Sequence, residues 1–413
     1  MQYQQHQLSN GLTVIAECNP KAHFSAFGYF VKTGSRDETA ELSGVSHFLE
    51  HMVFKGTPNR SADQVNELLD DMGSASNACT SVESTIYHAA VLPEFQPRII
   101  ELFSDLMRPS LRDEDFETEK KVIIEEIMMY ADQPPYGGHE KVMAEFFGDH
   151  PLGQSVLGTV DSVAALTPTQ MRGYFEQRYS PGNLAIAASG KVDFDEFVAQ
   201  VETHCGQWPA VETQRATPEA TYRNGFETLV QENSNLEYVI QLMQGPTRSD
   251  PDRFASRLLA TIFGDDSGSR MYWEFIDSGI AESAGMGNYE YQNGGLMMTV
   301  MYCAPETAQD NLDRLFRLQT KAREGVTQKE LDLAKSKIAS HIILASERTE
   351  SRMFSVGSQW LAEMEYRTVA EIAAKYQAVT LEEVNAVLEK YDLTKNMTLV
   401  VGPCKDLKPG SVG

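Results

Sequence analysis

The chain of 413 residues repeats part of itself, and this internal repeat limits its fold more than any other feature. In the first half, IIELF is followed by EDFETEKKVI. In the second half, LDRLF is followed by KELDLAKSKI. Phe103 pairs with Phe316 at a spacing of 213 residues, and Phe116 with Leu331 at a spacing of 215. The repeat predicts two copies of one unit of about 210 residues, which agrees with a length that suits two domains.

A polar segment from Trp208 to Gly225 separates the two copies. It contains two prolines and little periodicity, as interdomain linkers do. We therefore expect an N-terminal repeat at residues 1–208, a linker at 209–225 and a C-terminal repeat at 226–413. Both copies mix strand-like segments, such as GLTVIAE and GGLMMTVMYCAPE, with amphipathic helical segments, such as SADQVNELLDDMG and DPDRFASRLLATIFG.

Composition excludes several classes of protein. Hydrophobic residues make up 42% and charged residues 23%, as in soluble globular proteins, and no apolar stretch is long enough to span a membrane. The N-terminal sequence resembles neither a secretory signal nor a transit peptide. Five scattered cysteines without a CxxC pair argue against disulfides and predict a reducing cytoplasm. A net charge of −24 disfavours nucleic acid and anionic membranes as partners.

The segment GVSHFLEHMVFKG contains the strongest chemical motif. Its apolar residues recur at helical spacing, so His47, Glu50 and His51 are expected on one helix. Residues four apart share a helix face, so both imidazoles can reach one ion, while Glu50 can act as a base beside a metal-bound water. The alternative is a solvated helix face. The second copy has no such motif, so any metal chemistry belongs to the first.

A catalytic zinc ion needs a third protein ligand, and one acidic helix offers three candidates. Glu119 and Glu126 are seven residues apart and share a face, whereas Glu125 points about 100° away from Glu126. One of the pair can bind metal while the other supports the site. Without HFLEH, this helix would simply be acidic and solvated. At a spacing of 215, the second copy has Ala334 and His341 at these positions.

Five motifs together resemble the pitrilysin/insulinase family of zinc peptidases, in particular its short bacterial members and the beta-type subunits of mitochondrial processing peptidase. They are HFLEHMVFKGT, NACTSVESTIYHA, EKKVIIEEIMMYADQPP, HPLGQSVLGT and YSPGNLAIAASGKVD. The resemblance covers essentially the whole chain. It implies an α+β fold of two homologous α/β-roll repeats, with mixed, largely antiparallel sheets covered by helices, facing each other across a chamber. It also implies a zinc metalloendopeptidase that hydrolyses peptides or unfolded segments inside that chamber.

The resemblance also implies roles for individual residues. His47, His51 and Glu126 match the ligands of one zinc ion per chain, Glu50 matches the catalytic base, and Glu119 matches the acidic residue that supports the site. On a separate strand, Asn77 and Ala78 match the edge that pairs with the substrate backbone.

One departure concerns the second copy. The family usually has an Arg and a Tyr seven residues apart there, where this chain has Ile276 and Ser283. Tyr289 and Tyr291 are possible substitutes, although packing within a strand is the simpler role for both. The chain is therefore expected either to be an active peptidase, as a homodimer or with a related subunit that supplies the missing groups, or to be a non-catalytic subunit of the same fold. The homodimer is preferred, because nothing in the sequence names a partner.

Overall fold

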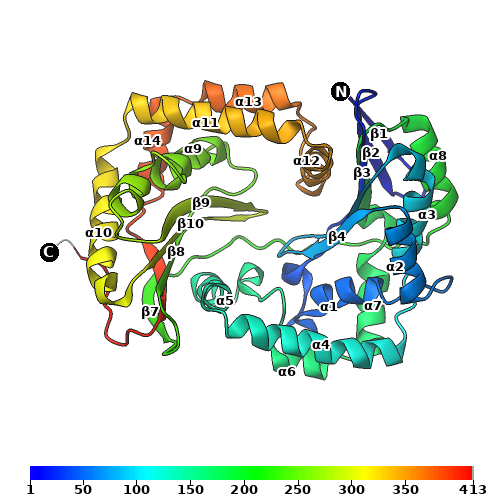
Figure 1. Cartoon of the computed structure of the whole chain (residues 1–413), viewed down its shortest axis with the longest axis horizontal. Coiled ribbons are helices and arrows are strands. Elements are labelled where there is room, and N and C mark those ends of the chain that lie inside the picture. The colour runs from blue at the N-terminus through cyan, green and yellow to red at the C-terminus, as the bar shows by residue number, and fades with distance from the viewer. Residues whose placement is uncertain (412–413) are drawn as a thin grey trace. The chain divides into compact units, whose positions relative to one another are not determined.

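The computed structural model describes residues 1–411 and divides into two compact units, neither of which is a continuous piece of chain (Figure 1). The first unit consists of Met1–Met128, Gln154–Ala216 and Leu344–Tyr366. The second consists of Met129–Gly153, Thr217–Ile343 and Arg367–Gly413. No helix in the described part of the chain is long and apolar enough to cross a membrane.

A six-stranded sheet forms the centre of the first unit. Its order is β1-β2-β6-β3-β5-β4, and all neighbouring pairs are antiparallel except β2 and β6. The strands are β1 (Gln2–Gln7), β2 (Thr13–Cys18), β3 (Ser25–Val31), β4 (Ala75–Thr80), β5 (Thr85–Val91) and β6 (Leu184–Gly190).

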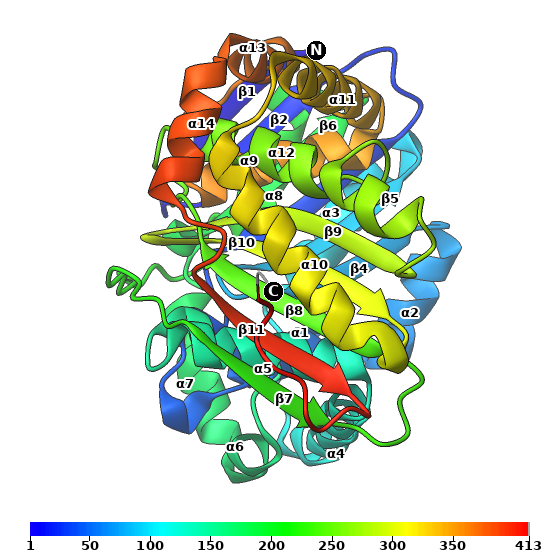
Figure 2. The same cartoon turned by 90° about the vertical axis from the view of Figure 1, so that its left-hand side faces the viewer.

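A five-stranded sheet forms the centre of the second unit, in the order β7-β11-β8-β10-β9 (Figure 2). Its strands are β7 (Gly225–Val230), β8 (Glu237–Gln244), β9 (Ser283–Tyr291), β10 (Gly294–Cys303) and β11 (Asn396–Gly402). This order repeats β2-β6-β3-β5-β4, and the single parallel pair, β7 with β11, occupies the place of β2 with β6. The expected α+β fold of two homologous halves is confirmed.

Helices cover both faces of the first sheet. They are α1 (Val45–Val53), α2 (Ala62–Asp71), α3 (Gln96–Leu106), α4 (Asp113–Ala131, whose last three residues fall in the second unit), α6 (Val160–Ala165), α7 (Pro168–Arg178), α8 (Phe194–Cys205) and α12 (Thr349–Leu361). The apolar residues of the HFLEH segment all join the core between this sheet and its helices: Val45, Phe48, Leu49, Met52 and Val53. The expected helix is therefore confirmed. The burial of its apolar residues fixes the positions of His47, Glu50 and His51.

The helices associated with the second sheet are α5 (Pro134–Phe147), α9 (Arg253–Gly264), α10 (Ala308–Lys321), α11 (Gln328–Ser346, whose last three residues fall in the first unit), α13 (Val369–Ala378) and α14 (Leu381–Lys390). Helices α4 and α11 are each 19 residues long, and their starts are 215 positions apart. The two helices are therefore separated by the same 215 residues as Phe116 and Leu331 in the sequence repeat.

Each copy contributes one helix to the other copy's sheet. Helix α5, from the first half of the chain, packs on β8 and β11, and a Cβ on its Gly138 would lie 2.8 Å from Val401. Helix α12, from the second half, packs on β2, β3 and β6, and its Met353 and Val356 lie in the core on that face. The repeats expected at residues 1–208 and 226–413 therefore follow the order of the chain. The compact units differ from them, because each unit includes one helix from the other half of the chain.

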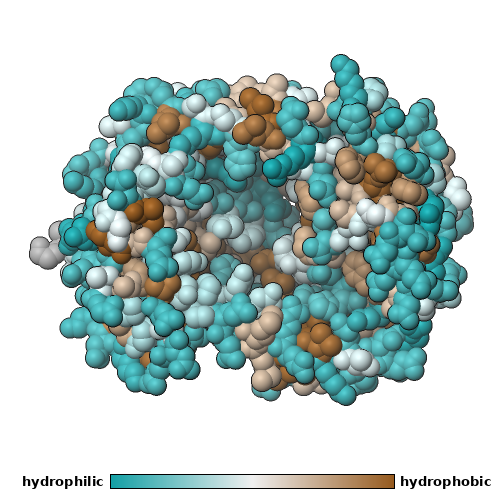
Figure 3. All heavy atoms as spheres, viewed as in Figure 1, coloured by the Kyte–Doolittle hydropathy of each residue, from teal (hydrophilic) through white to brown (hydrophobic). Residues whose placement is uncertain are grey.

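The segment between the repeats contains no helix or strand from residue 208 to residue 224, and the change from one unit to the other falls after Ala216. It is nevertheless fixed by contacts. Val211 exchanges hydrogen bonds with Ser180 in the first unit, and Arg223 donates to the carbonyl of Phe146 in the second. The face drawn in Figure 3 is mostly hydrophilic with scattered apolar side chains, as the composition predicts.

Candidate metal centre

The helix that carries HFLEH begins at a backbone arrangement that few sequences allow. Gly44 has a left-handed conformation (φ 91°), and a Cβ at this position would lie 2.6 Å from the carbonyl oxygen of Leu157. The buried carboxylate of Glu38 then accepts hydrogen bonds from the backbone N–H groups of Gly44, at 2.7 Å, and Ser46, at 2.8 Å. A carboxylate at a helix N-terminus satisfies donors that have no partner within the helix. The start of α1 is therefore fixed.

Three side chains from α1 and α4 converge on one point. The Nε2 atom of His47 lies 3.8 Å from Oε2 of Glu126, and Nε2 of His51 lies 3.6 Å from the same oxygen. One ligand atom from each of the three residues lies within 4.8 Å of the others. Ligands of a tetrahedral zinc ion are about 3.3 Å apart, so only a small contraction is needed to close the set on one ion. Two imidazoles and one carboxylate are also a common donor set for catalytic zinc.

The protonation of the two imidazoles differs. Burial, together with the neighbouring His51, lowers the pKa of His47 to about 4, so this ring is neutral near pH 7, as a metal ligand must be. For His51, burial acts to lower the pKa, but the hydrogen bond to Glu119 and the charges of Glu126, Glu119 and Glu50 outweigh it and raise the pKa. The acidic surroundings that favour a proton on His51 also favour a cation in its place.

Glu119 reaches the same group of residues from α4. Its Oε1 lies 2.9 Å from Nδ1 of His51, and its Oε2 lies 2.6 Å from Nζ of Lys55. A proton on Nδ1, donated to Glu119, leaves Nε2 of His51 free to face Glu126. The structure places Glu125 on the exposed face of α4, as the helical phase predicts. Sequence reasoning missed Lys55, which lies just beyond the end of α1, although its spacing of four from His51 was a usable signal.

Glu50 is half-buried beside these groups. Its Oε2 accepts a hydrogen bond from the hydroxyl of Thr80, at the end of β4. Figure 1 shows α1 between β4 and α4, so the three elements that carry the site are neighbours. Burial raises the pKa of the Glu50 carboxyl, although the hydrogen bond from Thr80 opposes the rise. A carboxylate with a raised pKa is better suited to hold a proton during a reaction.

Asn77 and Ala78 lie in β4, the outermost strand of the first sheet. Asn77 is opposite His88 and Ala78 opposite Tyr87 on β5. No strand within residues 1–411 pairs with the other edge of β4. The side chains alternate, with Asn77 exposed and Ala78 half-buried against the core. The side-chain oxygen of Asn77 also accepts a hydrogen bond from the backbone N–H of Ala78. An open edge of this kind can pair with an extended peptide.

The two positions that depart from the family pattern lie on different elements of the second unit. Ile276 ends the π-helical turn Tyr272–Ile276 and packs against the core of the second unit. Ser283 is the first residue of β9, and Tyr289 and Tyr291 lie further along that strand. Tyr289 is 41% exposed.

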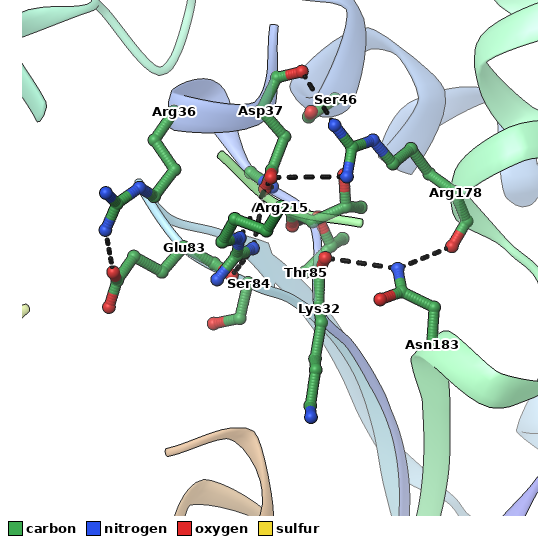
Figure 4. A network of polar contacts seen from close by, with 12 residues as sticks. Lys32, Arg36, Asp37, Ser46, Glu83, Ser84, Thr85, Arg178, Asn183 and Arg215 are labelled. Carbon is green, nitrogen blue, oxygen red and sulfur yellow. Dashed lines mark hydrogen bonds and ion pairs between the residues drawn. The ribbon is translucent and has the colours of Figure 1, made fainter. Parts of the chain in front are cut away.

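A buried polar network adjoins the start of α1 (Figure 4). The carboxylate of Asp37, which is fully buried, pairs with Arg215 at 2.6 Å and with Arg178 at 3.3 Å. Arg36 pairs with Glu83 in the same region. Nothing in the sequence pattern indicated these contacts, because Arg215 comes from the polar segment between the repeats.

Two family models match the chain. Residues 13–160 match insulinase (peptidase family M16), and residues 165–338 match the peptidase M16 inactive domain. The metal-centre residues and the edge strand all fall within the first match.

Individual proteins are similar over nearly the whole chain. An uncharacterized zinc protease of Mycobacterium tuberculosis is 33% identical over 403 residues, which is 96% of this chain and 92% of the relative. A probable beta subunit of the mitochondrial processing peptidase of Arabidopsis thaliana is 28% identical over 97% of this chain and 78% of its own. The crystal structure of a Helicobacter pylori protease superposes with a TM-score of 0.90 at 21% identity, covering 97% of this chain and 99% of that one.

Proposed function

The chain belongs to the insulinase family (peptidase family M16), and from this premise we propose that it is a zinc-dependent endopeptidase acting on peptides or unfolded segments. One observation carries the proposal. His47, His51 and Glu126 converge within 4.8 Å, directly beside the half-buried carboxylate of Glu50. Two imidazole nitrogens, a carboxylate and a neighbouring base are the parts that metal-assisted peptide hydrolysis requires.

In this proposal, the three residues hold one zinc ion per chain through Nε2 of His47, Nε2 of His51 and an oxygen of Glu126. When bound, zinc supplies a Lewis acid that polarises the scissile carbonyl and lowers the pKa of water. Glu50 accepts the proton of the attacking water and transfers it to the leaving amine. Glu119 keeps the proton of His51 on Nδ1, so that Nε2 presents a lone pair.

The substrate binds as an added strand along the open edge of β4 at Asn77 and Ala78. Hydrogen bonds to the backbone then dominate recognition, and cleavage tolerates many sequences. A peptide must be extended to bind in this way, so folded proteins are poor substrates. Enclosure of the peptide by the two repeats, which the family resemblance implies, stays a prediction.

The alternative is a subunit that needs a partner for full activity. Ile276 and Ser283 stand where the family usually has an Arg and a Tyr, and one relative is named as a beta subunit. We favour a homodimer over a heterodimer with a related chain, because nothing in the sequence points to a particular partner. We place the protein in the cytoplasm, where its five free cysteines would stay reduced.

The test combines zinc analysis by mass spectrometry with turnover of an internally quenched peptide by the purified chain. We expect about one zinc per chain, loss of zinc in His51→Ala, and retained zinc with turnover reduced about 10²–10⁴-fold in Glu50→Gln. Stoichiometric zinc in His51→Ala would refute the metal centre. Zinc without turnover would favour the non-catalytic subunit, and turnover that appears only with an added related chain would favour the heterodimer.

A further inference from the structure

Within residues 1–411, the hydroxyl of Thr80 donates the one hydrogen bond that reaches the side chain of the proposed base, Glu50. Thr80 is the last residue of β4, and its side chain is half-buried on the same side of the strand as Ala78. We propose that Thr80 is a positioning residue, which holds the carboxylate of Glu50 in the orientation that proton transfer needs. The inference rests on the proposed function, because it concerns the same reaction.

A glutamate on a helix does not keep one orientation by itself. Its terminal torsion is broad, so the two carboxylate oxygens can exchange places or swing away from a bound water. The hydrogen bond from Thr80 fixes Oε2 of Glu50. Among residues 1–411, no donor forms a hydrogen bond with the other oxygen, Oε1, which is therefore available to accept a proton. One fixed oxygen and one open oxygen are what an oriented base requires.

Thr80 can fix Glu50 only if Thr80 itself is fixed. The turn that follows, residues 81–84, closes with a hydrogen bond from the N–H of Ser81 to the carbonyl of Ser84 at 2.8 Å. It also docks on the segment before α1, since Arg36 donates its backbone N–H to Val82 at 3.0 Å. Opposite Thr80, the hydroxyl of Thr85 donates to the carbonyl of Thr33 at 3.0 Å. The end of β4 therefore has little freedom.

The linker adds a clamp to this turn (Figure 4). The guanidinium of Arg215 binds both oxygens of Asp37, at 2.9 and 2.6 Å, and donates to the backbone carbonyl of Glu83 at 2.6 Å. Arg215 thus ties the turn after Thr80 to the segment 35–38. Glu38, which follows Asp37 directly in this segment, accepts hydrogen bonds at the start of the helix that carries Glu50. The contacts of segment 35–38 therefore hold both partners of the Thr80–Glu50 hydrogen bond in place.

A purely structural reading is that Thr80 only satisfies a half-buried carboxylate. The two readings differ in what the loss of the hydroxyl changes. If Thr80 orients Glu50, its removal lowers the rate of the chemical step and leaves zinc content and substrate binding intact. If it only stabilises the fold, its removal lowers stability, and its effect on rate does not depend on Glu50.

The experiment uses full-length Thr80→Val and Thr80→Ser, each also combined with Glu50→Gln. We expect Thr80→Val to lower kcat about 10–100-fold, as small misplacements of reacting groups do, with KM and zinc content within about twofold of wild type. Thr80→Ser, which keeps the hydroxyl, should recover most of the rate. In the Glu50→Gln background, Thr80→Val should have no further effect. Thr203→Val, which makes the same change at an exposed position of α8 where the hydroxyl donates only to the carbonyl of Ala199, is the control.

An unchanged kcat in Thr80→Val overturns the inference, as does an equal loss of rate in the Glu50→Gln background or a loss of zinc. A second arm does not depend on turnover. Crystal structures of the zinc-loaded proteins should show one Glu50 conformer in the wild type and several in Thr80→Val, and a single unchanged conformer in the variant overturns the inference. A wild type without turnover, or a fully active Glu50→Gln, refutes the proposed function instead, and the crystallographic arm still decides the role of Thr80.

Discussion

The imidazole of His51 and the carboxylate of Glu119 lie 2.9 Å apart, Nδ1 to Oε1, and join the two helices that form the metal centre. The other oxygen of Glu119 binds the ammonium group of Lys55 at 2.6 Å. A proton on Nδ1 and a carboxylate behind it orient the ring and make Nε2 a stronger donor to a metal. We therefore predict that Glu119 contributes to metal binding without being a ligand.

Replacing Glu119 by Gln tests this role. The amide keeps the shape but loses the charge, so Nδ1–H loses a charged acceptor and Lys55 loses its partner. We expect zinc affinity to fall about 10–100-fold. Competition with a chelator of known affinity measures the change. An affinity equal to that of the wild type would show that Glu119 serves only the fold.

The proposed role of Glu126 as a metal ligand can be tested against its neighbour, Glu125, as a control. Glu126→Gln should weaken zinc binding more than Glu119→Gln does, because a ligand is lost rather than its support. Glu125→Gln should leave zinc affinity unchanged within about twofold, because Glu125 is on the exposed face of α4. The same chelator competition applies to both variants. If Glu125→Gln proves to be the variant that loses zinc, the assignment of this helix is wrong by one residue.

The clamp at Arg215 makes a prediction about stability. The side chain of Asp37 is fully buried, so Arg215→Met leaves its carboxylate with Arg178 as the remaining cation. Removing one partner of a buried ion pair is costly, and we expect a loss of about 2–4 kcal/mol in the free energy of unfolding. Arg98→Met is the matched control in the same unit. Its pair with Asp71 spans 3.9 Å between exposed side chains and should contribute less than about 0.5 kcal/mol. Urea unfolding of both variants gives the comparison, and equal losses would contradict the prediction.

Much of the metal centre could be predicted from the sequence because its geometry is local. Positions 47 and 51 share a helix face by the rise and turn of the helix alone, and the same argument separates Glu126 from Glu125. The spacing of 215 residues between copies reappears in the starts of α4 and α11. Periodicity and repeat spacing thus identified the helices that form the candidate metal centre.

Contacts between elements distant in the chain could not be predicted. Thr80 is 30 residues from Glu50, and the ion pair of Arg215 with Asp37 spans 178 residues. Nothing in a polar segment distinguishes an arginine that reaches a buried aspartate from one that faces water. Likewise, the amphipathic pattern of α12 shows that it needs an apolar partner, but not that the partner is the sheet of the other copy.

The ion pair between Arg270 and Glu330 in the second unit predicts a pH dependence of stability. Burial alone would raise the pKa of Glu330, but hydrogen bonds from Arg270 and Thr327 outweigh it and lower the pKa from 4.5 to about 2. Because the folded-state pKa lies below the unfolded one, this carboxylate stabilises the fold above about pH 4.5. The contribution is lost as the pH falls from there toward about 2.

Glu330→Gln should therefore cost about 1–2 kcal/mol at pH 7, allowing for a side chain that is 29% exposed, and much less at pH 3. Urea unfolding of the wild type and the variant at both pH values measures the difference. A loss that is the same at pH 3 as at pH 7 would show that the charge of Glu330 is not responsible.

The exchanged helix α12 provides the last prediction, from two glycines in helix interiors. A Cβ at Gly357 would lie 2.2 Å from the ring of Phe30, which is buried in the first sheet. Gly357→Ala must therefore push α12 away from the sheet, at a cost of about 1–3 kcal/mol. At Gly173, in α7, a Cβ would meet nothing within 4 Å, so Gly173→Ala should stabilise the protein by about 0.5–1 kcal/mol through helix propensity. Opposite shifts of the two urea midpoints are expected. Stabilisation by both substitutions would mean that α12 does not pack on this sheet in solution.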